Sequence, residues 1–177
     1  MRSIFHRFSI ALCLIAPLTA CGLADAHVIP PPTPTKAIAK GDFILVDKSD
    51  RVLIVMKGRT EVARFTDIKF GDAPVGHKQF EGDEKTPEGR YIIDARNPGS
   101  RYHLSLHINY PNTADRAFAA HQGKSPGGEI FIHGQPNGSP VKRLPHDWTD
   151  GCIALSNTEI RKLWGMIADG TEIVIRP

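Results

Sequence analysis

The sequence predicts a mostly β, sandwich-like domain with one firm helix. Short runs of β-branched and aromatic residues, separated by turn residues, recur between residues 43 and 108. Runs at this spacing are typical of strands joined by tight turns. One strong helical pattern follows at residues 160–167, where apolar residues recur every three or four positions. Strands therefore dominate, and a chain of 177 residues is long enough to bury one sizeable core.

The composition is that of an ordinary folded protein and does not favour a nucleic-acid partner. Charged residues make up 23% of the chain and hydrophobic residues 41%, which is not a disordered composition. The net charge of +3 is too small to indicate nucleic-acid binding. The sequence contains no glycine-rich phosphate loop, dinucleotide fingerprint or Cys-x-x-Cys pair, so we expect no cofactor and no metal.

Residues 1–20 predict a signal peptide of the lipoprotein type. A basic start is followed by an apolar run at residues 10–18, which is too short to span a membrane comfortably. The run ends in Leu-Thr-Ala-Cys, which resembles a bacterial lipobox with Cys21 as the acylated residue. A plain signal peptide cut near Ala20 or Ala26 is the alternative.

The lipobox interpretation predicts a periplasmic protein that is attached to a membrane through lipid on its first mature residue. Gly22, rather than Asp, follows the cysteine, which resembles sorting to the outer membrane. Residues 21–41 contain four prolines between positions 30 and 34 and predict an extended tether. We expect the folded domain at residues 42–177.

The first part of the domain predicts strands and one long excursion. Residues 43–46, 52–56 and 62–68 are expected to form an antiparallel meander, because turn residues separate them. Residues 69–89 are polar and glycine-rich, and they predict a long excursion before a strand at residues 91–94.

The alternating segment at residues 103–108 predicts a further strand. In it, His103, Ser105 and His107 would share one face. Two histidines without a carboxylate or a third histidine at suitable spacing do not indicate a metal site. Residues 113–120 then predict a short helix.

The end of the chain predicts the firm helix and a last strand. Ser156 and Glu159 have the spacing of a capping box, with a hydroxyl at the cap and a carboxylate three residues later. The apolar pattern that follows predicts a core-facing helix, and Gly170 is its expected stop. Residues 171–175 predict the last strand.

One cysteine is left without a disulfide partner after export. Cys13 leaves with the signal peptide and Cys21 takes the lipid, so Cys152 is alone in an oxidising compartment. A thiol becomes a useful nucleophile when a base lies within hydrogen-bond reach. The apolar run before His133 predicts a buried strand that fixes this histidine as the base. A buried, inert cysteine is the alternative, and His146, in a loop without a strand, is the competing base.

The spacing of these residues resembles the catalytic signature of the L,D-transpeptidase (YkuD-type) family. His133 and Gly134 begin the signature, and Thr-Asp-Gly-Cys at residues 149–152 ends it, with fifteen residues between the histidine and the threonine. A second match is Gly-Asp-Glu-Lys-Thr-Pro-Glu-Gly at residues 82–89, which also predicts a turn before the next strand.

Two positions depart from the family pattern and indicate a variant branch. Asp150 stands where the family usually has a second histidine, and Ala154 stands where it usually has an arginine. An ionised carboxylate beside the thiol would raise the thiol pKa and disfavour an oxyanion. We therefore expect Asp150 to point away, towards His146, Arg143 or a backbone donor.

The resemblance implies a β-sandwich of mixed sheets and a cysteine enzyme that acts on peptidoglycan stem peptides. Cys152 would attack the carbonyl of the L-centre of a diamino residue, expel the terminal D-alanine and form a thioester. His133 would act as general base and then as general acid, with its ring oriented by the Gly134 carbonyl. The N–H groups of Gly151 and Cys152 would hold the oxyanion.

The resemblance also implies the substrate contacts and leaves three function classes open. Tyr110 and Asn112 lie in a segment similar to the family's loop near the substrate cleft, and Thr149 and Asp150 lie beside the nucleophile; all four are candidates for substrate binding. Passing the thioester to an amine would make crosslinks, whereas passing it to water would trim stems or release an attached protein. A non-catalytic cell-wall-binding lipoprotein is the third class.

Overall fold

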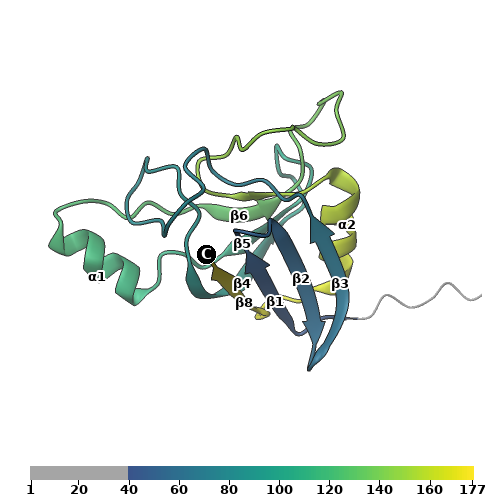
Figure 1. The fold of residues 1–177 in the computed structure, drawn as a ribbon, viewed down its shortest axis with the longest axis horizontal. Coiled ribbons are helices and arrows are strands. Elements are labelled where there is room, and N and C mark those ends of the chain that lie inside the picture. The colour runs from purple at the N-terminus through teal and green to yellow at the C-terminus, as the bar shows by residue number, and fades with distance from the viewer. Residues whose placement is uncertain (1–39) are drawn as a thin grey trace, which may run out of the picture. The chain divides into compact units, whose positions relative to one another are not determined.

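The computed structural model describes residues 40–177 (Figure 1). The expected signal peptide, the expected lipidation site Cys21 and nearly all of the expected tether lie outside these residues. Within them, no helix is long and apolar enough to cross a membrane. The elements are β1 Phe43–Asp47, β2 Val52–Lys57, β3 Thr60–Thr66, β4 Gly89–Asn97, β5 Ser105–Ile108, α1 Thr113–His121, β6 Ile130–His133, β7 Ile153–Ala154, α2 Asn157–Met166 and β8 Glu172–Arg176.

The strands of residues 40–177 form one mixed sheet in the order β3-β2-β1-β8-β4-β5-β6-β7. β1, β2 and β3 pair antiparallel, which confirms the predicted meander. β8 lies between β1, its parallel partner, and β4, its antiparallel partner. The mostly β fold class is therefore confirmed, with the last strand in the middle of the sheet.

β4 belongs to both halves of this sheet, which explains the sandwich-like shape. Residues 89–92 pair with β8, whereas residues 93–97 pair with β5. The register shifts between Ile93 and Ala95, and such irregularities bend a strand and increase its twist. The sheet therefore curls, and one continuous sheet supplies both walls of the domain.

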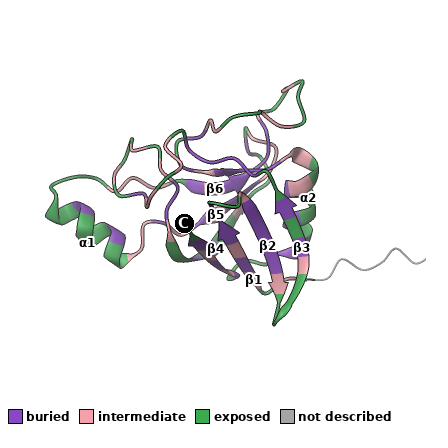
Figure 2. Ribbon diagram, viewed as in Figure 1, coloured by how far each residue is buried: buried purple, intermediate pink, exposed green. Residues whose placement is uncertain are grey.

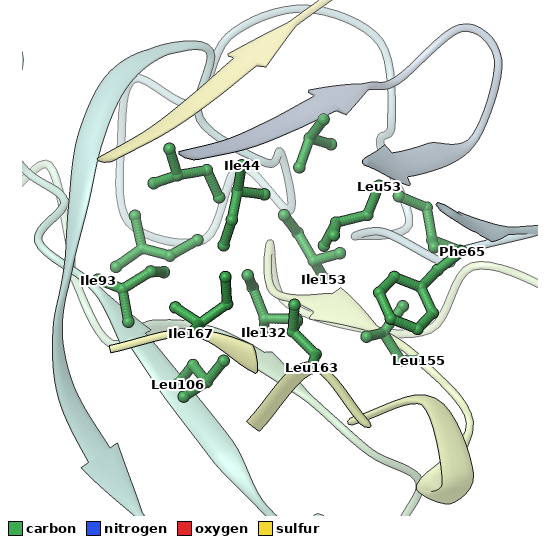
Figure 3. Close-up of a cluster of buried hydrophobic side chains, with 14 of the residues drawn as sticks. Ile44, Leu53, Phe65, Ile93, Leu106, Ile132, Ile153, Leu155, Leu163 and Ile167 are labelled. Carbon is green, nitrogen blue, oxygen red and sulfur yellow. The ribbon is translucent and has the colours of Figure 1, made fainter. Parts of the chain in front are cut away.

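The apolar core lies inside the curl (Figures 2 and 3). Figure 3 shows Ile44 and Leu53, from β1 and β2, on the opposite side of the core from Leu106 and Ile132, from β5 and β6. Leu163 of α2 completes this cluster, and all five side chains are fully buried. The core thus holds β5 and β6 firmly, and the catalytic candidate His133 is the last residue of β6.

The expectation that three side chains share a face at residues 103–108 is wrong for His103. This residue precedes β5 and has a φ of 70°, so it lies in a turn and not in the strand. Its Nε2 accepts a hydrogen bond of 2.9 Å from Arg161 of α2. Ser105 and His107 remain in β5.

The start of α2 is predicted correctly, but its end is not. Ser156 Oγ accepts from the Glu159 N–H at 3.3 Å, and the Glu159 carboxylate accepts from the Ser156 N–H at 2.9 Å, which confirms the capping box. The helix ends at Met166, because Ile167 is extended (ψ 141°) and buries its side chain in the core from there. Gly170, the expected stop, lies beyond the helix in the turn before β8.

Candidate active site

His133 is held by its own neighbour in the chain. The residue is only 3% exposed, and its Nδ1 lies 2.7 Å from the carbonyl oxygen of Gly134. Nδ1 therefore carries the proton and donates, which leaves Nε2 as an acceptor. A Cβ at Gly134 would lie 2.5 Å from the Asn157 side chain, so glycine is required for this close approach.

Two aromatic rings cover the imidazole of His133. The Tyr102 ring centre lies 4.7 Å from that of His133, and the Trp148 ring centre lies 5.4 Å from it in an edge arrangement. Burial lowers the pKa of His133 to about 4, against the opposing effect of the Gly134 carbonyl. The imidazole is therefore neutral at neutral pH.

Cys152 lies beside β6, in the same cavity as His133. Parallel pairing of Ile132 with Ile153 brings the cysteine next to this strand. The Cys152 Sγ accepts a hydrogen bond from the Phe131 N–H at 3.4 Å and donates to the Glu129 carbonyl oxygen at 3.5 Å. Within residues 40–177, no hydrogen bond joins the thiol to His133.

The resting thiol of Cys152 is protonated. Burial raises its pKa to about 11, the Phe131 N–H opposes this, and the carboxylate of Asp150 raises the pKa further. The candidate pair is thus a neutral thiol and a neutral imidazole, and not a thiolate–imidazolium ion pair.

Thr149 holds the turn that presents Cys152. Its Oγ1 donates to the Cys152 carbonyl oxygen at 2.8 Å and accepts from the Gly151 N–H at 3.2 Å. The hydroxyl of Thr149 therefore makes its hydrogen bonds within the turn, and its expected substrate contact remains a prediction. The Gly151 N–H is occupied as well, whereas the Cys152 N–H has no hydrogen-bond partner in the part of the chain that the structure describes.

The backbone of residues 82–89, the second motif that resembles the family, packs against this turn. A Cβ at Gly71 would lie 1.9 Å from the Glu84 carbonyl oxygen and 2.9 Å from the Gly151 nitrogen. A Cβ at Gly151, where φ is 120°, would lie 2.4 Å from the Lys85 carbonyl oxygen. Residues 82–89 thus support the cysteine turn, in addition to forming the predicted turn before β4.

The cavity around the pair has a volume of about 810 Å³. Aromatic side chains and glycines form much of its wall, and its charged lining residues are Lys78, Glu81, Arg101, Glu129 and Asp150. A space of this size accommodates a peptide segment or a drug-sized ligand. The shape and the lining are therefore those of a binding site around a potential nucleophile.

The family model described as the YkuD L,D-transpeptidase catalytic domain matches residues 41–175. The chain belongs to this YkuD family. The resemblance that the signature predicted is thereby confirmed, for nearly all of the described part of the chain.

Three proteins illustrate the similarity of this YkuD domain to known relatives. YafK of Escherichia coli (strain K12) is 32% identical over 95 residues, which are 52% of this chain and 32% of YafK. The helical cell shape determining protein Pgp2 from Campylobacter jejuni has a TM-score of 0.61 at 33% identity, over 80% of this chain and 51% of Pgp2. Bdellovibrio bacteriovorus Bd1075 has a TM-score of 0.54 at 28% identity, over 81% of this chain and 50% of Bd1075. The chain spans about a third of YafK and about half of the other two.

The cavity of Cys152 does not include Tyr110 or Asn112, so their expected substrate contacts remain predictions. Tyr110 is 3% exposed and donates its hydroxyl to the Pro126 carbonyl oxygen at 3.0 Å. Asn112 caps α1 and accepts from the backbone N–H of Ala114 at 2.8 Å and of Asp115 at 3.1 Å. One residue is thus a core aromatic with a bonded hydroxyl, and the other stabilises a helix start.

Asp150 lies at the cavity but does not adopt the expected orientation. It is exposed and makes no hydrogen bond with His146, Arg143 or any backbone donor in residues 40–177. Arg143 instead pairs with Glu159 of α2. His146, the competing base, is exposed and does not line the cavity of Cys152.

Sequence reasoning missed the residues that surround the pair. Trp148 directly precedes the Thr-Asp-Gly-Cys signature, and this adjacency was an available signal. Tyr102 and Glu129 are distant from Cys152 in sequence and carry no characteristic spacing. They reach the cavity only through the pairing of β5 with β6 and of β6 with β7.

Proposed function

We propose that this YkuD domain is a cysteine acyltransferase that acts on peptidoglycan stem peptides in cell-wall crosslinking or remodelling. The observation that carries the proposal is the shared cavity of Cys152 and a neutral His133 whose Nε2 is free to accept a proton. The likeness to Pgp2, described as a helical cell shape determining protein, supports a role in remodelling the wall.

In the first step the thiol leaves the Glu129 carbonyl and transfers its proton to Nε2 of His133 as the sulfur attacks the substrate carbonyl. A base acting during attack suits a pair that rests in the neutral state. The Cys152 N–H stabilises the oxyanion, and the Gly151 N–H joins it after leaving Thr149. The C–N bond to D-alanine then breaks, and protonated His133 donates its proton to the departing amine.

In the second step an amine or water attacks the thioester. His133 accepts the proton of the attacking group, the C–S bond breaks, and the thiol is restored. An amine acceptor makes a crosslink or attaches a protein, whereas water gives an L,D-carboxypeptidase or amidase reaction. Both outcomes use the same residues, so the acceptor decides the product.

The first experiment tests whether Cys152 is a working nucleophile. Purified protein is treated with a carbapenem and weighed intact, and muropeptides of treated sacculi are then analysed. We expect an adduct on Cys152, with either new crosslinks or shortened stems. An absence of both adduct and turnover would instead support a non-catalytic wall-binding protein.

Three variants rank the roles within the proposed mechanism. Cys152→Ala and His133→Ala should abolish turnover, because the nucleophile and the base are each required. Asp150→Ala should retain partial activity, because its carboxylate bonds to no group of the described chain. Equal inactivity of Asp150→Ala and Cys152→Ala, in correctly folded proteins, would refute this ranking.

We also infer that Cys21 carries lipid and anchors the domain in the periplasm, at the outer membrane in keeping with Gly22 as the sorting residue. The support is the lipobox sequence alone. Expression in a bacterial host, followed by membrane fractionation and mass measurement of the N-terminal peptide, tests this. Cys21→Ser should release the protein from the membrane fraction, and an unmodified Cys21 in a membrane-free wild type would refute the inference.

A further inference from the structure

Asp147 is the centre of a set of hydrogen bonds that the proposed mechanism does not use. Its carboxylate accepts from Nη1 and Nη2 of Arg51 at 2.7 Å each, and from the Phe70 N–H at 2.9 Å. Such a two-pronged arginine–carboxylate pair fixes orientation as well as charge. Neither Arg51 nor Asp147 lines the cavity of Cys152.

The same segment of backbone also holds the two residues that follow Asp147. The Phe70 carbonyl oxygen accepts from the N–H of Trp148 at 3.2 Å and of Thr149 at 3.1 Å, and the Asp72 N–H donates to the Thr149 carbonyl at 3.2 Å. Residues 147–149 are therefore attached to residues 70–72 immediately before the turn that presents the thiol.

Trp148 transmits this attachment to the catalytic histidine. Its ring centre lies 5.4 Å from that of His133 and 5.7 Å from that of Tyr102, so the three rings contact one another. The position of the Trp148 backbone decides how closely its ring covers the imidazole. Asp147, which Arg51 holds by two hydrogen bonds, fixes the backbone directly before Trp148.

We propose that Asp147, held by Arg51, is a positioning residue of the active site that fixes Trp148 against His133. The catalytic part of this proposal rests on the proposed function, whereas the positioning of the imidazole does not. A pair that served stability alone would leave His133 unaffected when it is weakened.

The surroundings of His133 determine how its protonation reports on this positioning. Tyr102 and Trp148 pack against the ring and Cys152 shares its cavity, whose charged lining residues are Lys78, Glu81, Arg101, Glu129 and Asp150. Neither Arg51 nor Asp147 is among them. A changed titration of His133 in an Asp147 variant would therefore report movement of Trp148 and admission of water, and not lost contact with a charge.

The decisive variant is Asp147→Asn. It keeps the shape and the Oδ1 that accepts from the Phe70 N–H and from Nη1 of Arg51, but it removes the negative charge and sets an amide N–H against Nη2 of Arg51, so the two-bond ion pair is lost. We expect the NMR-monitored pKa of His133 to rise by about one unit or more towards that of a solvated histidine. Turnover of sacculi should fall by about ten- to a hundredfold in kcat, with KM close to the wild-type value.

Matched variants separate positioning from loss of an ion pair in general. Asp169→Asn removes the partner of Arg96, a pair with a 2.7 Å contact outside the cavity, and should leave both His133 and kcat unchanged. Arg51→Lys keeps the positive charge but cannot make both hydrogen bonds to Asp147. If Asp147→Asn does not fold, the His133 pKa and kcat are measured in Arg51→Lys instead. The double variant Asp147→Asn with Trp148→Ala should be no less active than Trp148→Ala alone, because both changes act on one contact.

The outcomes distinguish this proposal from the proposed function. A wild-type His133 titration and kcat in folded Asp147→Asn would overturn the positioning role. Wild-type protein that has no activity on sacculi, yet shows the His133 shift on substitution of Asp147, would refute the proposed function and keep the positioning. Additive losses in the double variant would show that Asp147 does not act through Trp148 and would overturn the proposal.

Discussion

His133 is buried, although an exposed histidine side chain titrates in the physiological pH range. Burial lowers its pKa from 6.5 to about 4. Between these two values the unfolded chain binds the proton and the folded chain does not. The stability that the neutral imidazole contributes is therefore fully present above pH 6.5 and is lost as the pH falls through 4.

This gives a testable difference between wild type and His133→Gln. Between pH 7 and pH 4.5 the free energy of unfolding of the wild type should fall by roughly 2 kcal/mol more than that of the variant. Urea unfolding of both proteins at the two pH values measures this difference. The variant is the control for carboxylates, which titrate in both proteins, and an equal fall in both would show that His133 is solvated.

Asp150 gives a second prediction at the scale of one residue. Burial is the main cause of the raised thiol pKa of Cys152, but the carboxylate of Asp150 adds to it. Asp150→Asn should therefore lower this pKa and speed alkylation of Cys152 by iodoacetamide at pH 8 by about threefold or more. Asp169→Asn, outside the cavity, should leave the rate unchanged. An unaltered rate in Asp150→Asn would exclude the electrostatic effect.

The sequence could predict those site residues whose contacts follow from their neighbours in the chain. The histidine–glycine contact follows from adjacency, and Cys152 stands out because its competitors are expected to be lost on export. The aromatic cover of Tyr102 depends on strand pairing and leaves no pattern of spacing. Asn112 remains a predicted substrate contact, while its side chain caps α1, which is an ordinary role of a polar residue before a helix.

At the scale of one element, the capping box of α2 has a measurable effect. Ser156→Ala removes the acceptor for the Glu159 N–H and should lower the free energy of unfolding by about 0.5–2 kcal/mol. Thr158→Ala, an exposed position in the same helix, should change it by no more than about 0.5 kcal/mol. Denaturant unfolding compares the two, and equal effects would contradict a capping role for Ser156.

The turn before Cys152 is sensitive for a different reason, because three stretches of backbone meet there. Gly71→Ala places a methyl group within 1.9 Å of the Glu84 carbonyl oxygen, so residues 82–89 must move away. We expect a loss of about 1–3 kcal/mol in stability and faster alkylation of Cys152. Gly58→Ala is the control for the alkylation rate: it strains the backbone at a φ of 56°, but its Cβ meets nothing within 4 Å, so Cys152 should react as in the wild type. Unchanged alkylation in Gly71→Ala would show that the turn does not depend on this packing.

For the whole molecule, the parts that sequence could predict are local. The meander β1–β3 and the cap of α2 each follow from residues close together in the chain. The place of β8 does not, because its two partners, β1 and β4, are chosen by burial on both sides of the curled sheet. The predicted sandwich was therefore correct in its layers, while its origin in one continuous sheet required the structure.

The central place of β8 has a consequence for how the domain is made. On the ribosome, β1 and β4 emerge long before residues 172–176, so each waits with one free edge until the final strand arrives. Free edges pair readily with strands of other molecules. The domain therefore completes its fold only after β8 has emerged, and a chain that stops before Glu172 would be a candidate for aggregation and degradation.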